Sequence, residues 1–64
     1  MKSYNELYHD VLSNGMGLFE NQVKLNTWMG TPNKNLGDLP VNFLSSYSGL
    51  ELVESELNRI KLGL

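Results

Sequence analysis

The pattern of apolar and polar positions predicts a helix at the start of the chain. Ser3 and Glu6 have the spacing of a capping box, in which two side chains satisfy the free N–H groups of a helix start. Apolar side chains then recur at the spacing of one helical face, at Tyr4, Leu7, Tyr8, Val11 and Leu12. Asn14-Gly15 supplies a stop, because Gly readily takes the left-handed conformation that ends helices. We therefore expect a first helix from Ser3 to about Asn14.

A second helix is expected from about Glu20 to Met29. Its apolar positions are Phe19, Val23, Leu25, Trp28 and Met29. Two residues in its middle, Asn and Thr, have low helix propensity, so this helix depends on packing. Gly30 can end it, and the residue that precedes Pro32 is disfavoured in a helix.

The segment from Trp28 to Leu44 organises the chain, since it holds the only Trp, both Pro residues and two of the six Gly residues. We interpret Trp28 as a core residue at the point where a helix meets its loop, with a binding anchor as the alternative. Residues 31–38 are rich in turn formers and form an extended loop, which Leu36 anchors to the core. Pro40 suits the first position of a short helix that ends near Ser45 and buries Phe43 and Leu44.

The last helix is expected from about Gly49 to Leu62. Ser48 and Glu51 have capping-box spacing, and acidic residues lie early and basic residues late, the order that the helix dipole favours. An apolar stripe has the spacing 3, 4, 3, 4 along Leu50, Val53, Leu57, Ile60 and Leu64. Most of this stripe covers the core, and its end at 60–64 fits either the core or a contact with another chain. The pattern predicts an all-α fold: a single domain, residues 1–64, forming a small bundle of about four helices with a Pro/Asn/Gly-rich loop between helices 2 and 3.

Composition excludes several classes of protein. With 64 residues and no Cys, the chain can form one small domain without disulfides or thiolate metal ligands. Its net charge of −2 and lack of a basic stripe argue against nucleic-acid binding by this chain alone. No signal-peptide pattern is present, and no apolar run approaches the roughly 18 residues that span a bilayer. We expect a cytoplasmic protein without membrane contact, stabilised by a partner or by homodimer formation.

The candidate catalytic and metal-binding residues do not combine into a site. His9 lies on the polar side of the first helix, and Asp10 points about 100° away around that helix. The acidic residues Glu51, Glu54 and Glu56 are attributed to capping and solvation, since only Glu51 and Glu54 share a face. The glycines do not match a phosphate-binding pattern. We therefore expect no enzyme activity, no cofactor and no metal.

The spacing of the residues after position 18 resembles a known family. The chain is similar to the toxin-binding C-terminal domain of the Xre/MbcA/ParS antitoxins from about Phe19 to Leu64. The resemblance is carried, in order, by Trp28-Met29-Gly30-Thr31-Pro32-Asn33, Leu36-Gly37, Pro40, Phe43-Leu44, Gly49, Val53, Leu57, Arg59-Ile60 and Gly63.

This resemblance implies an all-helical domain that binds and neutralises a cognate toxin. In the best-known systems the toxin is a RES-domain enzyme that attacks NAD⁺, and the last helix and tail of the antitoxin block its active-site cleft. By position, the residues that would face the toxin are Arg59, Ile60, Lys61, Leu62, Gly63 and Leu64. Those that would shape the domain are Trp28, Pro32, Asn33, Leu36, Gly37, Pro40, Gly49, Val53 and Leu57.

The sequence departs from this family at its start. Full antitoxins carry a helix-turn-helix region before this domain, whereas here residues 1–18 are expected to form one extra N-terminal helix, which indicates a stand-alone short form. This helix either replaces a lost DNA-binding region or caps the core. The loop before Pro40 is one residue short, and Leu39 stands where a capping Ser or Thr is usual. Two alternatives follow: a phage-type anti-defence inhibitor with the same fold, for example of a CRISPR or other defence effector, or an accessory module that only dimerises.

Overall fold

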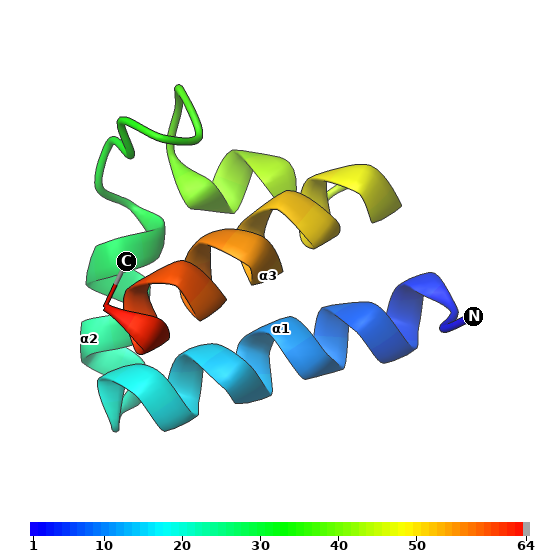
Figure 1. The fold of residues 1–64 in the computed structure, drawn as a ribbon, viewed down its shortest axis with the longest axis horizontal. Coiled ribbons are helices and arrows are strands. Elements are labelled where there is room, and N and C mark those ends of the chain that lie inside the picture. The colour runs from blue at the N-terminus through cyan, green and yellow to red at the C-terminus, as the bar shows by residue number, and fades with distance from the viewer. Residues whose placement is uncertain (64) are drawn as a thin grey trace.

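Two long helices lie side by side and run in the same direction, as the computed structural model shows (Figure 1). The structure describes residues 1–63, which contain three α-helices, one turn of 3₁₀ helix and no strand. The elements are α1 (Tyr4–Phe19), α2 (Gln22–Met29), η1 (Pro40–Phe43) and α3 (Tyr47–Leu62). The all-α class is confirmed, with the third of about four expected helices reduced to a 3₁₀ turn.

Side-chain contacts at both ends of the pair fix the parallel arrangement of α1 and α3. Near the start of α1, the Tyr4 hydroxyl donates to the carbonyl oxygen of Leu44, which lies just before α3. Ten residues further along α1, Asn14 Nδ2 donates to Asn58 Oδ1 at 3.0 Å. Because both helices start at the same end, α2 and the following loop carry the chain back to that end before α3 begins (Figure 1).

The start of α1 agrees with the sequence, but its end does not. The Ser3 hydroxyl accepts from the Glu6 amide at 3.2 Å, and the Glu6 carboxylate accepts from the Ser3 amide at 3.0 Å, which confirms the capping box. The helix continues through Asn14-Gly15 to Phe19, so the predicted stop is wrong. The chain turns instead at Glu20, which has a φ of 74°.

Gly15 serves helix packing rather than helix termination. It is buried in the middle of α1, and a Cβ at this position would lie 2.5 Å from Leu25 Cδ1 of α2. The missing side chain therefore allows α2 to approach α1 closely. This requirement for space depends on a residue ten positions away, which explains why local sequence suggested a stop.

The second helix begins two residues later than expected, after its cap at Asn21. The Asn21 side chain accepts from the Lys24 amide at 2.8 Å. Leu25 and Met29 are buried, whereas Val23, expected among the apolar positions, is 75% exposed. Trp28 is half-buried and packs against the core and against Phe19, with ring centroids 5.7 Å apart, which supports the core interpretation.

The 3₁₀ turn determines where α3 starts. Ser46, not Ser48, caps α3 by accepting from the Gly49 amide at 3.0 Å, so the predicted capping box at Ser48 is wrong. Gly49 is buried against η1, and a Cβ there would lie 2.0 Å from the Phe43 carbonyl oxygen. Because η1 ends at Phe43 and rests on the first turn of α3, the helix begins two residues earlier than the spacing indicated.

The core lies between the three α-helices. Its buried apolar residues are Leu7, Val11, Leu25, Met29, Leu50, Val53 and Leu57. Leu36 packs against this core from the loop, as expected, as do Phe43 and Leu44. Along residues 1–63, no helix has the length and apolar character needed to cross a membrane.

Candidate protein-binding site

A buried carboxylate joins the loop before η1 to the second half of α3. Glu56 is only 6% exposed. Its two neighbours in the sequence differ, since Ser55 is exposed and Leu57 is buried. Arg59 Nε and Nη2 donate to its two carboxylate oxygens at 2.8 and 2.9 Å. Asn33 Nδ2 donates at 3.2 Å and Asn35 Nδ2 at 3.2 and 3.4 Å. Both oxygens of Glu56 are thus bonded from two directions, the loop and the last turns of α3.

Asn33 holds the loop closed with the other end of its side chain. Its Oδ1 accepts from the amides of Asn35 and Leu36 at 2.9 and 3.0 Å. Its own backbone pairs with Asp38 in an isolated bridge, and Gly37, with a φ of 84°, makes the tight turn between them. One amide side chain therefore fixes the loop shape and attaches it to α3.

These bonds hold Glu56 in its ionised form. The Arg59 hydrogen bonds, helped by those from Asn35 and Asn33, outweigh burial and lower the pKa of Glu56 from 4.5 to about 2. The same contact raises the pKa of Arg59. At neutral pH the pair is a permanent ionic contact that restrains the Arg59 side chain, which remains 41% exposed.

The structure distributes the predicted toxin-facing residues around α3 instead of placing them on one face. Arg59 is held by Glu56, and Ile60 is half-buried in register with the core stripe. Lys61 is exposed on a different side, and Leu62 is 71% exposed. At about 100° per residue, Leu62 and Arg59 lie only about 60° apart. Gly63 ends the helix with a φ of 76°, and Leu64 lies outside the described residues.

The predicted domain-shaping residues have clear positions. Pro32 lies near the start of the loop and is exposed, whereas Pro40 is buried at the first position of η1. Val53 and Leu57 are fully buried in the core. Gly49 has the close contact with η1 described above. Asn33 is bonded to Glu56 of α3, and Leu36 and Trp28 pack against the core.

Sequence reasoning missed Glu56 and Asn35. The attribution of Glu56 to capping and solvation is wrong, because the side chain is buried and bonded to three residues. One signal was available: Glu56 lies three residues before Arg59 and directly beside the buried stripe of α3. The contribution of the loop was not visible, since Asn33 and Asn35 are more than twenty residues away in the sequence.

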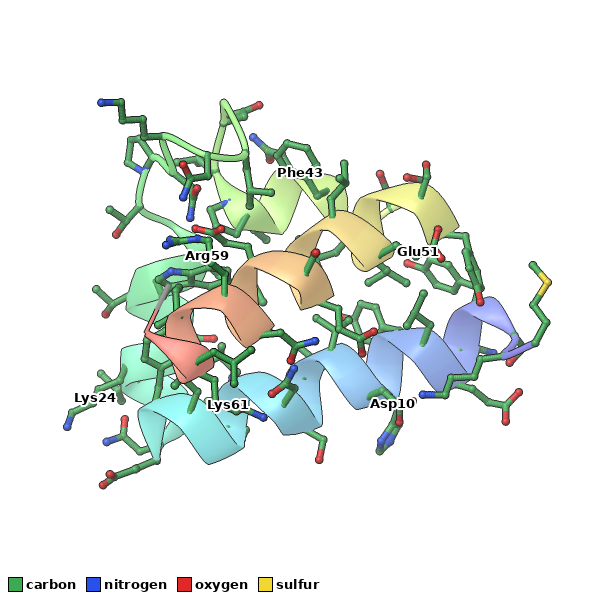
Figure 2. All side chains as sticks on the ribbon, viewed as in Figure 1. Asp10, Lys24, Phe43, Glu51, Arg59 and Lys61 are labelled. Carbon is green, nitrogen blue, oxygen red and sulfur yellow. The ribbon has the colours of Figure 1, made fainter. Side chains whose placement is uncertain are left out.

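Other polar groups do not form a second site in the described part of the chain. His9 is exposed, and with Lys2, Asn5, Glu6 and Asp10 it lines only an open depression on α1. Figure 2 shows Asp10 on α1 and Glu51 on α3 far from the Arg59 end of the molecule. Within residues 1–63, no three His, Cys, Asp or Glu side chains gather closely enough to hold a metal ion.

Comparison with protein families gives one match that spans most of the chain. The family model described as the antitoxin Xre/MbcA/ParS C-terminal toxin-binding domain matches residues 15–63. The match begins four residues before the region that the sequence motifs indicated and includes the loop, η1 and all of α3. Comparison with curated proteins and with solved structures gives no match. The chain therefore belongs to the family of antitoxin Xre/MbcA/ParS C-terminal toxin-binding domains.

Proposed function

We propose that this protein binds a partner toxin enzyme through the second half of α3 and neutralises it by covering its active site. The observation that carries the proposal is the family match over residues 15–63, since this family is one of toxin-binding domains. Leu62, which is 71% exposed near the end of α3 and lies outside the core, is the apolar side chain that this surface would present to the partner.

The basic last turn of α3 favours an acidic partner surface at that end of the helix. Arg59 and Lys61 lie in its last turn, where no acidic residue occurs. The negative end of the helix dipole explains part of this preference for basic residues. Because Glu56 already compensates the charge of Arg59, Lys61 is the charge that complements a carboxylate-lined cleft, and complementary charges speed association and select the partner. A RES-type NAD⁺-degrading enzyme is the partner that we propose.

The Glu56 contact suits this role because it restrains the binding element before the partner arrives. Arg side chains lose considerable rotamer entropy when they are fixed in an interface. Here the two bonds to Glu56 already fix the guanidinium. The attached loop then braces the helix from one side through Asn33 and Asn35.

The test is a pull-down with the tagged chain from its native host, followed by mass spectrometry. We expect one toxin-like enzyme to co-purify, and we expect the purified chain to inhibit its NAD⁺ consumption at a stoichiometric ratio. An enzyme that binds but stays fully active would contradict active-site occlusion. Recovery of a nuclease or another defence component, with no toxin, would replace the antitoxin role by an anti-defence role.

A further inference from the structure

The connection between α1 and α2 is short and has a strained backbone. Two residues, Glu20 and Asn21, join the end of α1 at Phe19 to the start of α2 at Gln22. Glu20 has a φ of 74°, in the left-handed region that a residue with a side chain occupies at a cost. Its amide donates to the carbonyl oxygen of Met16 at 2.8 Å, which holds the turn closed. We call residues 20–21 the hinge, because a short strained connection between two helices favours any arrangement in which it opens.

The helix on the N-terminal side of the hinge, α1, supplies one wall of the core. Leu7 and Val11 are buried in the core between the helices. Tyr4 donates to the segment just before α3, and Asn14 donates to a side chain of α3. Gly15 leaves the space that a leucine of α2 fills. The other elements, α2, η1 and α3, therefore form a slot whose shape and hydrogen-bonding groups fit this one helix.

The connectivity allows α1 to leave this slot as a unit. Within residues 1–63, the hinge is the one covalent link between α1 and the elements that form the slot. The start of α1 lies at the opposite end of the molecule from the hinge (Figure 1). The capping box at Ser3 and the ion pair between Lys2 and Asp10 are internal to residues 2–10, so α1 keeps these bonds when it moves. Residues 4–14 of α1 also precede the region that matches the family, so the family pattern does not include this segment.

We propose that two copies of this chain exchange α1, so that α1 of each copy fills the slot of the other. Every contact between α1 and the slot is formed again between the two copies, whereas the left-handed conformation at Glu20 is released in both when the hinge opens. Exchange of an identical element is a low-cost route to a dimer. The interface is the core itself, and interfaces of permanent dimers resemble a domain core cut in half. Because association costs the freedom of two separate chains, the monomer dominates in dilute solution and the exchanged dimer at high concentration.

The exchange leaves the loop and the last turns of α3 as they are in the monomer. Glu56 is bonded by Arg59 on its own helix and by Asn33 and Asn35 of the loop, and all of these residues lie outside α1. An exchanged dimer therefore carries this end of α3 twice. The inference does not depend on the proposed function, because it uses contacts within this chain and none with a toxin.

The first test measures how much dimer forms after the chain is unfolded in urea and refolded at low and at high concentration. The readout is light scattering on a sizing column. Glu20→Gly removes the cost of the left-handed conformation and keeps the length of the hinge, whereas Glu20→Gln keeps that cost and removes only the charge. We expect wild type and Glu20→Gln to dimerise to the same extent, and Glu20→Gly to raise the dissociation constant at least about 10-fold. A wild-type chain that is monomeric at every concentration, or equal dimerisation of the two variants, would overturn the proposal.

The second test identifies which helices meet in the dimer. The chain has no Cys, so Asn14→Cys in one copy and Asn58→Cys in the other place one thiol on each side of the contact between α1 and α3. Refolded together and treated with a short bis-maleimide, these two variants should give a cross-linked dimer. The matched control pairs Asn14→Cys with Leu52→Cys, since Leu52 is 53% exposed and lies about 120° around α3 from Asn58, and it should give none. Dimers that cross-link equally in both pairs, or in neither, would join the copies through their outer surfaces and would overturn the exchange.

Discussion

Replacement of Glu56 by Gln tests whether the carboxylate that joins the loop to α3 stabilises the fold. Gln has nearly the same shape as Glu but carries no charge, and one of its two terminal atoms is a donor. That NH₂ group would face the donors of Arg59, Asn33 or Asn35, all of which now point at the carboxylate. The variant therefore loses the charge-assisted bonds and gains a donor without an acceptor.

The pKa of Glu56 gives the size of the stability loss expected for Glu56→Gln. A pKa lowered from 4.5 to about 2 corresponds to about 3 kcal/mol of stability at neutral pH, at about 1.4 kcal/mol per pKa unit. Because Arg59 is 41% exposed, solvent screens part of this energy. We expect Glu56→Gln to lower the free energy of unfolding by about 1–3 kcal/mol, a large share for a domain with a total of about 3–10 kcal/mol.

The sign of the pH dependence follows from the direction of the shift. Since the folded pKa is below the unfolded one, the stabilisation is complete above about pH 4.5 and disappears as the pH falls through about 2. The difference between wild type and Glu56→Gln should therefore shrink from about pH 5 downward. Hydrogen bonds to Ser3 also lower the pKa of Glu6, but this contribution is common to both proteins and cancels.

The assay is urea unfolding followed by far-ultraviolet circular dichroism at several pH values. Glu51→Gln, an exposed position on the same helix, is the matched control for the loss of one negative charge. A Glu56→Gln variant that is within about 0.5 kcal/mol of Glu51→Gln at neutral pH would refute the reasoning, because surface substitutions have effects of that size. A difference that does not change with pH would show that packing, not ionisation, is responsible.

Five further substitutions, arranged in three comparisons, test the packing and capping features that the sequence did not reveal. Gly15→Ala should lower the free energy of unfolding by about 1–3 kcal/mol, because its Cβ would lie 2.5 Å from a buried leucine side chain. Gly17→Ala on the same helix is the control: its Cβ would meet nothing within 4 Å, so the change should be neutral or stabilising. Gly49→Ala should cost more than Gly15→Ala, since its Cβ would meet a backbone carbonyl oxygen at 2.0 Å. Ser46→Ala should cost about 1 kcal/mol through loss of the N-cap, and Ser48→Ala almost nothing. Thermal unfolding compares the stabilities of all five variants. A reversed order between Gly15→Ala and Gly17→Ala, between Gly49→Ala and Gly15→Ala, or between Ser46→Ala and Ser48→Ala would contradict the contact assigned to the first residue of that pair.

Much of the helical framework is local and was therefore predictable. The capping box at Ser3 acts over three residues, and the apolar spacing of Leu50, Val53 and Leu57 reports one helical face wherever the helix lies. The helix end near Pro32 also follows from local sterics. Motif order alone identified the family, because a family pattern is a property of the sequence and needs no contact information.

Two of the errors in helix boundaries occur where a tertiary contact decides. The local sequence around Gly15 predicts the end of a helix, yet Leu25 of α2 packs against Gly15 and the helix continues. Ser48 has the capping spacing, but the 3₁₀ turn packed on Gly49 gives the cap to Ser46. In each case the tertiary contact changed the position of a helix boundary and left the existence of the helix unchanged.

The sequence by itself therefore determined the class of fold, the helices and the family of this protein. Only the tertiary structure decided what the polar residues of the loop and of the second half of α3 do. Glu56 belongs to a solvated helix face by its local pattern, but the loop brings Asn33 and Asn35 onto it across more than twenty residues. The physical reason is that apolar periodicity is encoded by neighbours three and four residues apart, whereas the burial of a charge depends on donors that only the complete fold brings within reach.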